Sequence, residues 1–347
     1  MVINTYLTDK LGIRVPLVMG GMQWVGTPAL AAAACNAGAL GMITALTQPS
    51  PEELKRAIEK TRSAIDPTIA KERSAFGAFG VNITLLPAVV PPDYEGYARA
   101  GVEAGVRIFE TAGNNPGPVI KILKEAGAFV IHKCTSIRHG LTALRLGADM
   151  LSIDGWECAG HPGEDDIGGL ILLALAAEQV NAPFIASGGV ANGRGLAAVL
   201  ALGAVGANMG TRFMATKESE IDDKIKQKIL EAGERDTAHI LRSLRNTTRV
   251  FKNSVTKEVL QLESRKADFK EIQPWVSGQR GREVYTRGDP EAGVWTAGQT
   301  LGLIHDIVRL SDSPQPTCKE LVARIEKEAE ERIKTSYRYL SGPSAKL

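Results

Sequence analysis

The 347-residue sequence predicts an α/β fold, a closed (β/α)8 TIM barrel with an inserted small helical subdomain. Up to about residue 215, short apolar runs alternate with segments of helical spacing, as in βα units around a parallel sheet. A polar or glycine-rich group follows almost every apolar run, and in a barrel these strand ends meet on the face where active sites form. We therefore assign residues 1–217 and 290–347 to the barrel, and residues 218–289 to an inserted helical subdomain that covers the active-site cleft.

The apolar runs supply eight expected strands. Several are almost continuously apolar, which is typical of parallel strands buried on both faces. They are expected at residues 15–19, 40–44, 80–83, 107–110, 129–132, 150–153, 184–186 and 206–209.

Helix start signals lie between these runs. Thr27 precedes Pro28, and Ser50 precedes Pro51 and stands three residues before Glu53, so both are expected to cap helices. Helical spacing is clear at residues 29–37, 118–126 and 196–202, and residues 295–304 look like a turn feeding the last barrel helix. The charged segment 319–338 is expected to be an amphipathic helix packed on the outside.

Composition favours a small-molecule partner. Lysine plus arginine (41) nearly balances aspartate plus glutamate (39), and the formal charge of +2 argues against nucleic acid as a ligand. The four cysteines include no Cys-x-x-Cys pair, so a zinc site or disulfide framework is not expected. No apolar run approaches the roughly 18 residues that cross a bilayer, so no membrane association is expected.

The expected compartment is the cytoplasm. The chain ends in Ala345, Lys346 and Leu347, a conservative variant of a peroxisomal address that would indicate peroxisomes in a eukaryote. A homodimer is compatible with the sequence.

Residues 154–166, DGWECAGHPGEDD, are the best candidate for the chemistry, with His161 at their centre. Glycines let the backbone approach a ligand closely, and histidine has the side-chain pKa nearest to neutral pH. The alternative is a glycine-rich turn with a solvated histidine. A metal site built from His161 and Cys158 is disfavoured, because two ligands make no tetrahedral set.

The last two strand ends indicate a phosphate site. Ser187, Gly188 and Gly189 follow the seventh strand, and Gly210 and Thr211 follow the eighth. In many barrels these two loops hold a phosphate on backbone N–H groups. No G-x-G-x-x-G follows a strand, so a mononucleotide phosphate is favoured over a Rossmann dinucleotide site.

Several motifs resemble the nitronate monooxygenase family, formerly called 2-nitropropane dioxygenases. They are GGMQW at 20–24, HKC at 132–134, DGWECAGHPGEDD, ASGG at 186–189, NMGTRF at 208–213, SLRNT at 243–247 and SGQRG at 277–281. The likeness spans about residues 15–304 and looks most like the branch that includes NADH:quinone reductases. It implies an FMN-dependent barrel.

The resemblance also implies which residues bind FMN. Lys133 would lie near the isoalloxazine ring, and His161 matches the active-site histidine of the family. The implied FMN contacts are Gly21, Met22, Gln23, Asn82, Lys133, Asp154, Ala159, Gly160, Ser187, Gly188, Gly189, Asn208, Met209, Gly210 and Thr211.

Two activities compete under this family name. A nitronate monooxygenase would oxidise an alkyl nitronate with O2 to a carbonyl compound and nitrite, with His161 removing a proton beside the nitro group or binding the nitronate oxygens. An NAD(P)H:quinone reductase would instead use NAD(P)H as electron donor. A flavin-binding protein without turnover and an enoyl-thioester reductase are further alternatives.

Three loops outside the expected FMN contacts are also expected to bear on the active-site cleft. Residues 66–79 look longer than in the family and are expected to alter access to the cleft. Residues 84–94, rich in proline, suggest a semi-rigid lid or nicotinamide contact, with a packed surface loop as the alternative. Residues 243–247 are expected to line the cleft beside the insertion, unless they belong to a solvated basic helix.

Overall fold

Eight parallel strands close into a barrel in the computed structural model, which describes residues 3–86, 91–306 and 316–341. Each strand pairs with the next along the chain, and β1 pairs with β8. The strands are β1 Leu17–Met19, β2 Leu40–Thr44, β3 Phe79–Leu85, β4 Ile108–Gly113, β5 Phe129–Cys134, β6 Met150–Asp154, β7 Phe184–Ser187 and β8 Ala207–Met209. All eight expected strands are therefore present, with ends that differ by up to three residues.

Helices surround the barrel. As expected, the Ser50 hydroxyl accepts a hydrogen bond from the Glu53 N–H (3.2 Å), and Thr27 caps its helix in the same way. The helices outside the insertion are α1 Tyr6–Leu11, α2 Pro28–Asn36, α3 Pro51–Ala64, α4 Pro67–Glu72, α5 Tyr94–Glu103, α6 Gly117–Glu125, α7 Ile137–Arg145, α8 Gly169–Gln179, α9 Gly193–Ala201, α10 Thr211–Met214 and α15 Cys318–Ser341.

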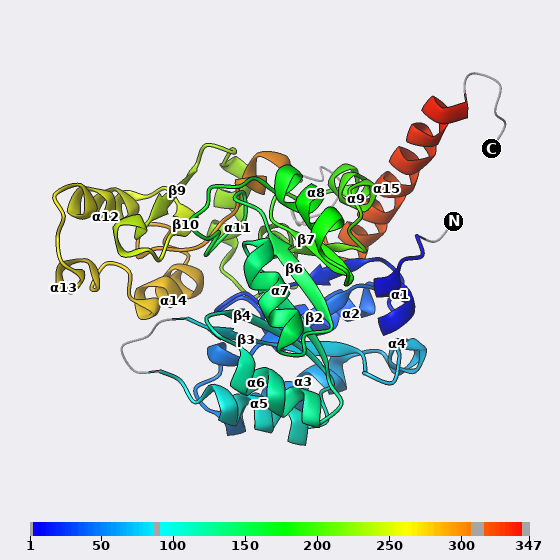
Figure 1. Ribbon diagram of the computed structural model, residues 1–347. Helices are drawn as coiled ribbons and strands as arrows, with labels where there is room; N and C mark the ends of the chain where they lie inside the picture. Colours follow the sequence, from blue (N-terminus) through cyan, green and yellow to red (C-terminus); the bar gives the residue numbers. More distant parts are fainter. Residues whose placement is uncertain (1–2, 87–90, 307–315, 342–347) are drawn as a thin grey trace.

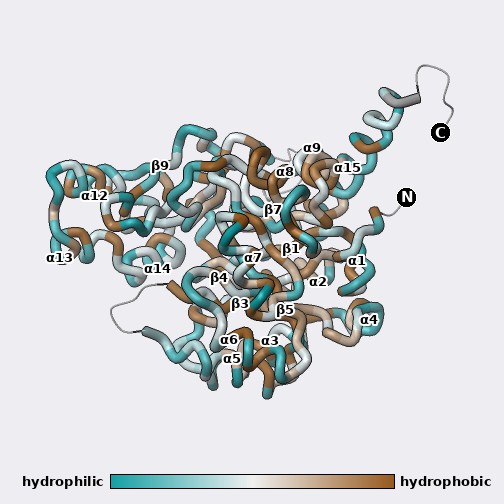
Figure 2. The backbone as a smooth tube through the Cα atoms, viewed as in Figure 1, coloured by the Kyte–Doolittle hydropathy of each residue, from teal (hydrophilic) through white to brown (hydrophobic). Residues whose placement is uncertain are grey.

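The last barrel helix is α15, which packs between α9 and α2. The helix expected at residues 319–338 thus completes the ring itself, and its outer end projects from the body in Figure 1. Residues 295–304 do not lead straight into a barrel helix, because a 3-10 helix, η3 (Gln299–Leu303), follows the turn. Figure 2 shows hydrophobic segments within the barrel and hydrophilic ones along α4 and the outer end of α15.

The barrel interior changes from apolar to polar along the strands. Near the amino ends an apolar cluster closes the barrel floor, where Leu7 and Leu11 of α1 pack with side chains from six strands, among them Met42, Ile131 and Met150. Nearer the carboxyl ends the buried side chains are polar: Asn82, Glu110, Ser152, Asp154, Ser187 and Asn208. Burying a polar group costs free energy unless the group is hydrogen-bonded. The side chains of this layer must therefore hydrogen-bond to one another or to a ligand.

Residues 218–289 contain helices, as expected, and an antiparallel strand pair that was not expected. The elements are α11 Asp223–Glu231, β9 Thr237–Ile240, a 3-10 helix η2 (Arg242–Leu244), β10 Thr248–Phe251, α12 Ser254–Ser264, α13 Phe269–Ile272 and α14 Gly278–Arg287. Part of this region has its own small core, made by Ile240, Val250, Val259, Leu262 and Ile272. Ile225 and Ile229 of α11 belong instead to the large core shared with the barrel helices.

The expectation that residues 66–79 alter access to the cleft is wrong. The Arg73 guanidinium donates to the carbonyl oxygens of Gly12, Cys35 and Ala39, and the Ser74 N–H donates to Leu11. These partners lie at the end of α1, at the end of α2 and in the loop before β2, so the segment braces the amino-terminal end of the barrel. Figure 1 shows α4 beside α1, far from the insertion.

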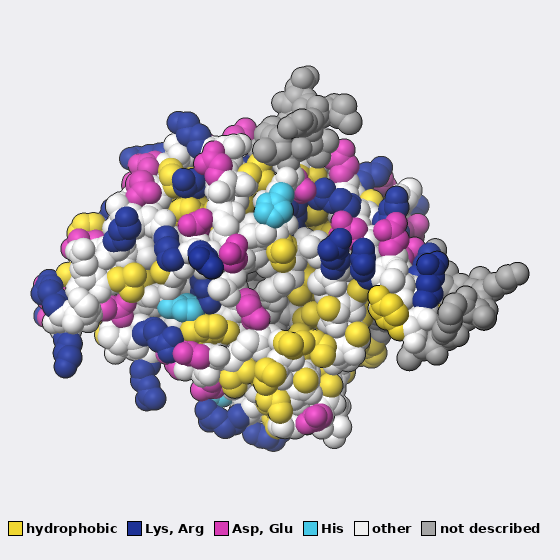
Figure 3. All heavy atoms as spheres, turned by 90° about the horizontal axis from the view of Figure 1, so that it is seen from above, with side chains coloured by type: hydrophobic (Ala, Val, Ile, Leu, Met, Phe, Trp, Pro, Cys, Tyr) yellow, Lys and Arg dark blue, Asp and Glu magenta, His cyan; other side chains and the backbone are white. Residues whose placement is uncertain are grey.

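The two signs of charge are mixed over the face shown in Figure 3, which agrees with the near-zero net charge. Within the described residues, no helix is long and apolar enough to cross a membrane. Residues 345–347, which bear on the compartment, and residues 87–90 of the loop considered as a lid lie outside the described residues.

Candidate active site

The carboxylates of residues 154–166 mostly fix the loop that follows β6. Glu157 accepts two bonds from the Gly169 N–H (3.1 and 2.9 Å) and so caps α8. Glu164 accepts from the N–H (2.9 Å) and the hydroxyl (2.6 Å) of Thr247. Asp166 accepts from the guanidinium of Arg242 (2.9 and 3.0 Å). Thr247, the last residue of the SLRNT segment 243–247, and Arg242, which precedes that segment, therefore lie against this loop.

Gly160 joins the loop to strand β10. Its N–H donates to the Arg249 carbonyl (3.1 Å), and the Arg249 N–H donates back. Gly160 has φ +74°, and a Cβ there would meet no atom within 4 Å. The backbone is thus held firmly beside open space, which is the geometry that close approach of a ligand requires.

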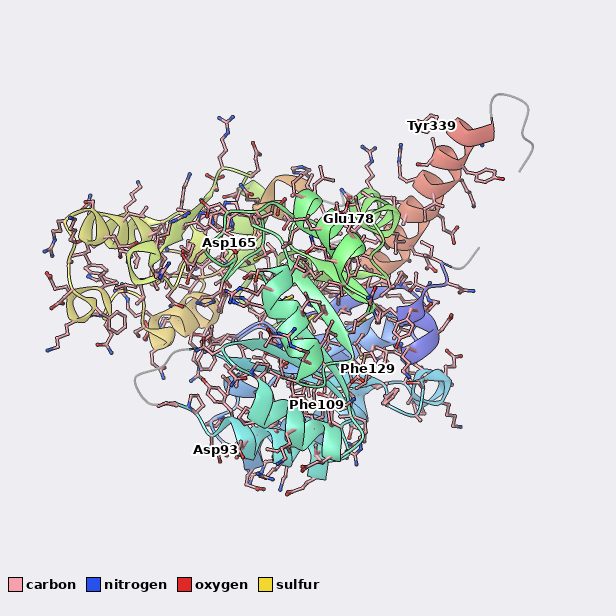
Figure 4. The ribbon with its side chains drawn as sticks, in the orientation of Figure 1. Asp93, Phe109, Phe129, Asp165, Glu178 and Tyr339 are labelled. Atoms are coloured by element: carbon pink, nitrogen blue, oxygen red, sulfur yellow. The ribbon has the colours of Figure 1, made fainter. Side chains whose placement is uncertain are left out.

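His161 follows directly. Its side chain is partly exposed and makes no hydrogen bond within the described part of the chain. Burial lowers the pKa of His161 to about 4, although Glu164 opposes the shift. The imidazole is therefore uncharged at neutral pH, and it is a weaker base than the near-neutral pKa expected from the sequence. In Figure 4, Asp165 of this loop lies on the insertion side, and Phe129, at the start of β5, lies toward the other end of the barrel.

Lys133 bridges two other residues implied by the sequence. Its ammonium donates to the Asp154 carboxylate (2.9 Å) and to the Ser187 hydroxyl (3.0 Å), so β5, β6 and β7 are connected at their carboxyl ends. Burial opposes the charge on Lys133, but Asp154 and Glu110 outweigh it and raise the pKa of the ammonium. A permanent cation therefore lies in the barrel mouth.

The glycine-rich ends of β7 and β8 leave backbone donors free. Gly188 and Gly189 have φ +80° and +74°, and in the described structure the N–H groups of Gly188, Gly189 and Gly210 donate to no acceptor. Met22 lies near Gly210, since a Cβ on that glycine would be 3.4 Å from the Met22 sulfur. Successive free N–H groups at such turns form an anion-binding concavity.

The amino end of α9 itself is already occupied. Asn192 accepts from the Gly195 N–H (3.0 Å), and Glu328 of α15 accepts from the Gly193 N–H (2.9 Å). An anion at this edge must therefore rely on Gly188, Gly189 and the start of α10. The Thr211 hydroxyl accepts from the Gly298 N–H (3.0 Å), which connects α10 to residues 295–304.

Two asparagines that the family resemblance implies as FMN contacts donate hydrogen bonds to the same residue, which the sequence did not single out. Asn82 and Asn208 both donate to the buried Glu110 (2.7 and 2.8 Å), and so does the N–H of Gly21 (3.2 Å). The change from apolar to polar residues after Phe109, within β4, was the sequence signal for Glu110.

Three side chains near these residues do not belong to the polar layer inside the barrel. His132 points away from the barrel interior and bonds the Thr111 hydroxyl (2.9 Å), and the Met209 side chain is packed in the outer core. Gln23 is exposed.

Comparison with known proteins identifies the family. A family model described as nitronate monooxygenase matches residues 4–328. The chain belongs to the nitronate monooxygenase family.

Relatives in this group carry different activities in their names. A (3aS,4S,5R,7aS)-5-hydroxy-7a-methyl-1-oxo-octahydro-1H-indene-4-carboxyl-CoA dehydrogenase from Rhodococcus jostii (strain RHA1) is 30% identical over 95% of this chain and 97% of its own. A nitronate monooxygenase from Paraburkholderia phytofirmans is 27% identical over 94% and 95% of the two chains. The structure of FabK from Thermotoga maritima has 33% identity, covers 97% of this chain and 99% of its own, and superposes with a TM-score of 0.86.

The nitronate monooxygenase family consists of FMN-dependent oxidoreductases, and this protein is an oxidoreductase enzyme of that type. The mouth fits such a group: free N–H donors suit a phosphate, the open space beside Gly160 lets a ligand approach the backbone, and Lys133 supplies a cation. Among the described residues there is no group of three His, Cys, Asp or Glu side chains that could hold a metal ion.

Proposed function

We propose that this protein is a nitronate monooxygenase, which oxidises an alkyl nitronate with O2 to a carbonyl compound and nitrite. One observation carries the proposal: His161 is uncharged and has no hydrogen-bond partner among the described residues, and it stands on a fixed loop at the same barrel edge as the free N–H groups and Lys133. That edge can hold a flavin and a small anionic substrate together.

The residues that would hold FMN divide into two sets. Ser187, Gly188, Gly189, Gly210 and Thr211 would bind the phosphate, the three glycines through free backbone N–H groups. Around the ring we propose Gly21, Met22, Gln23, Asn82, Lys133, Asp154, Ala159, Gly160, Asn208 and Met209, the last through its backbone.

His161 would bind the substrate. A low pKa makes the imidazole a poor acceptor for the proton of a neutral nitroalkane, but it leaves an N–H that can donate to a nitronate oxygen. The substrate is therefore expected to arrive already deprotonated. FMN held by these residues would supply the redox chemistry that connects oxidation of the nitronate to reduction of dioxygen.

A second candidate is oxidation or reduction of a thioester-linked substrate. It is favoured by the 30% identity to a carboxyl-CoA dehydrogenase over nearly the whole chain. Carbon beside a thioester carbonyl, like carbon beside a nitro group, becomes acidic through an electron-withdrawing neighbour, so the same mouth suits both. NAD(P)H:quinone reduction differs by requiring a pyridine nucleotide as electron donor.

Anaerobic stopped-flow absorbance distinguishes these functions. The FMN-loaded protein is mixed with propionate 3-nitronate, the neutral nitroalkane, NADH, NADPH or an acyl-CoA, and the flavin absorbance is followed; nitrite is then measured after O2 is admitted. Fast bleaching by the nitronate, with nitrite formed and slow reaction of the neutral nitroalkane, is expected. Bleaching by NADH or NADPH alone would establish the reductase instead, and bleaching by the acyl-CoA alone the thioester chemistry.

A further inference from the structure

Glu110 is a fully buried carboxylate in the barrel interior, and the proposed function gives it no role. Its two oxygens accept three hydrogen bonds: Oε1 from the Gly21 N–H and the Asn82 amide, and Oε2 from the Asn208 amide. Asn82 lies within β3, Asn208 within β8 and Gly21 just after β1, and these strands are not all neighbours in the barrel. One side chain therefore connects β3, β8 and the backbone after β1 across the interior.

The charge of Glu110 is compensated within the same layer. Burial raises the pKa of the Glu110 carboxyl, and Lys133 together with the N–H donors opposes that shift. Lys133 in turn is bonded to Asp154 and Ser187, so Glu110 belongs to the charge network of the mouth. Buried networks of this kind are rigid when every member is satisfied.

The glycines of the GGMQ segment fit around the two asparagines. A Cβ at Gly20 would lie 2.2 Å from Asn208 Oδ1, and a Cβ at Gly21 would lie 2.1 Å from Asn82 Cγ. Only glycine lets the backbone after β1 lie directly on these amides. The position of residues 20–22 is thus set by Asn82 and Asn208, and both of these are held by Glu110.

We propose that Glu110 is a positioning residue of the flavin site, which fixes Asn82, Asn208 and the backbone after β1 in the arrangement that binds FMN. This inference rests on the proposed FMN site. Glu110 acts through these residues and lies beneath the backbone that would contact the ring. Without the carboxylate, three N–H groups lose their acceptor and the backbone after β1 loses its support.

The test compares Glu110→Gln with Thr111→Val. Thr111 is the next residue of β4, is equally buried, and points to the other side of the strand, where it bonds His132. Thr111→Val therefore removes a buried hydrogen bond from the same strand without touching the interior layer. The dissociation constant of FMN from each apoprotein is measured by quenching of flavin fluorescence, and unfolding is followed in parallel by urea titration.

We expect Glu110→Gln to raise the FMN dissociation constant at least tenfold, and Thr111→Val to leave it within twofold at a comparable loss of stability. The reduction potential of the bound flavin should move to more positive values in Glu110→Gln, because a negative charge beside Lys133 is gone. A dissociation constant within twofold of the wild type, or a loss shared by Thr111→Val, would overturn the inference.

A double-mutant cycle makes the test independent of the amount of folded Glu110→Gln protein. Asn208→Ala removes one donor of the same network, so the double variant should bind FMN no more weakly than Glu110→Gln alone. Additive losses would mean that Glu110 and Asn208 act separately and would contradict the inference. Wild-type protein that fails to bind FMN would refute the proposed function itself, which is a separate outcome.

Discussion

Gly160 and Arg249 exchange two backbone hydrogen bonds, although they are 89 positions apart in the sequence and belong to the loop after β6 and to strand β10. Gly160 thereby forms an isolated antiparallel bridge with strand β10. Since His161 is the next residue, its position depends on β10 as well as on β6. The Arg249 side chain strengthens this link by donating to the Trp156 carbonyl (2.8 Å).

Removing the imidazole tests the role of His161. His161→Ala should bind FMN with unchanged affinity and lose turnover by about a hundredfold or more, the usual contribution of a positioned acid, base or hydrogen-bond donor. Steady-state kinetics with nitronate and a flavin titration provide the two measurements. Turnover equal to that of the wild type would show that His161 does not act on the substrate.

The pH dependence of turnover should lack the usual histidine step. Because the pKa of His161 is lowered to about 4, the imidazole stays uncharged from pH 6 to pH 8, and kcat/KM should be flat across that range. An inflection is expected only as the pH falls toward 4. A step near pH 6.5 that disappears in His161→Gln would contradict the lowered pKa.

Loosening the loop without touching His161 should also reduce activity. Thr247→Val removes the hydroxyl bond to Glu164, and we expect kcat to fall several-fold with little change in FMN affinity. Asp165→Asn is the matched control, because Asp165 lies in the same loop, is exposed and makes no hydrogen bond within the described residues. Equal effects of the two substitutions would argue against a positioning role for the Glu164–Thr247 contact.

The free energy of unfolding should fall in mild acid because of His132. Burial lowers its pKa to about 4, against about 6.5 in the unfolded chain, so its stabilising effect is complete above pH 6.5 and is lost as the pH falls toward 4. Between pH 7 and pH 5 the free energy of unfolding should drop by about 2 kcal/mol on account of His132. Urea titrations at both pH values measure this, and His132→Gln should flatten the difference by a similar amount.

Breaking the Lys133–Asp154 pair should cost both stability and flavin affinity. The side chains are 20% and 9% exposed, so Lys133→Met leaves a largely buried carboxylate without its cation, a change that typically costs about 3–5 kcal/mol. Asp154→Asn in the same chain should restore part of the stability. The exposed pair Arg99–Glu95 is the control, and Arg99→Met should change the free energy of unfolding by less than about 1 kcal/mol.

Sequence periodicity was sufficient to predict the barrel, because the local sequence pattern and the tertiary structure agree in that part of the chain. Buried parallel strands read as apolar runs, and cap residues such as Ser50 bond within three positions, so both signals lie within a short window. Residues 66–79 were misjudged because their contacts are to α1 and the loop before β2, distant in sequence. The strand pair β9–β10 was missed because four-residue strands carry little periodic signal.

The sequence by itself determined the eight-strand barrel, the family and most residue types at the mouth, since each depends on local pattern or short motifs. Tertiary structure alone decided the hydrogen bonds of Glu110, the lowered pKa of His161 and the connection of Gly160 to Arg249. These properties depend on burial and on contacts between residues far apart in the chain. Hydrogen bonding and desolvation act through space, so no local window of the sequence contains them.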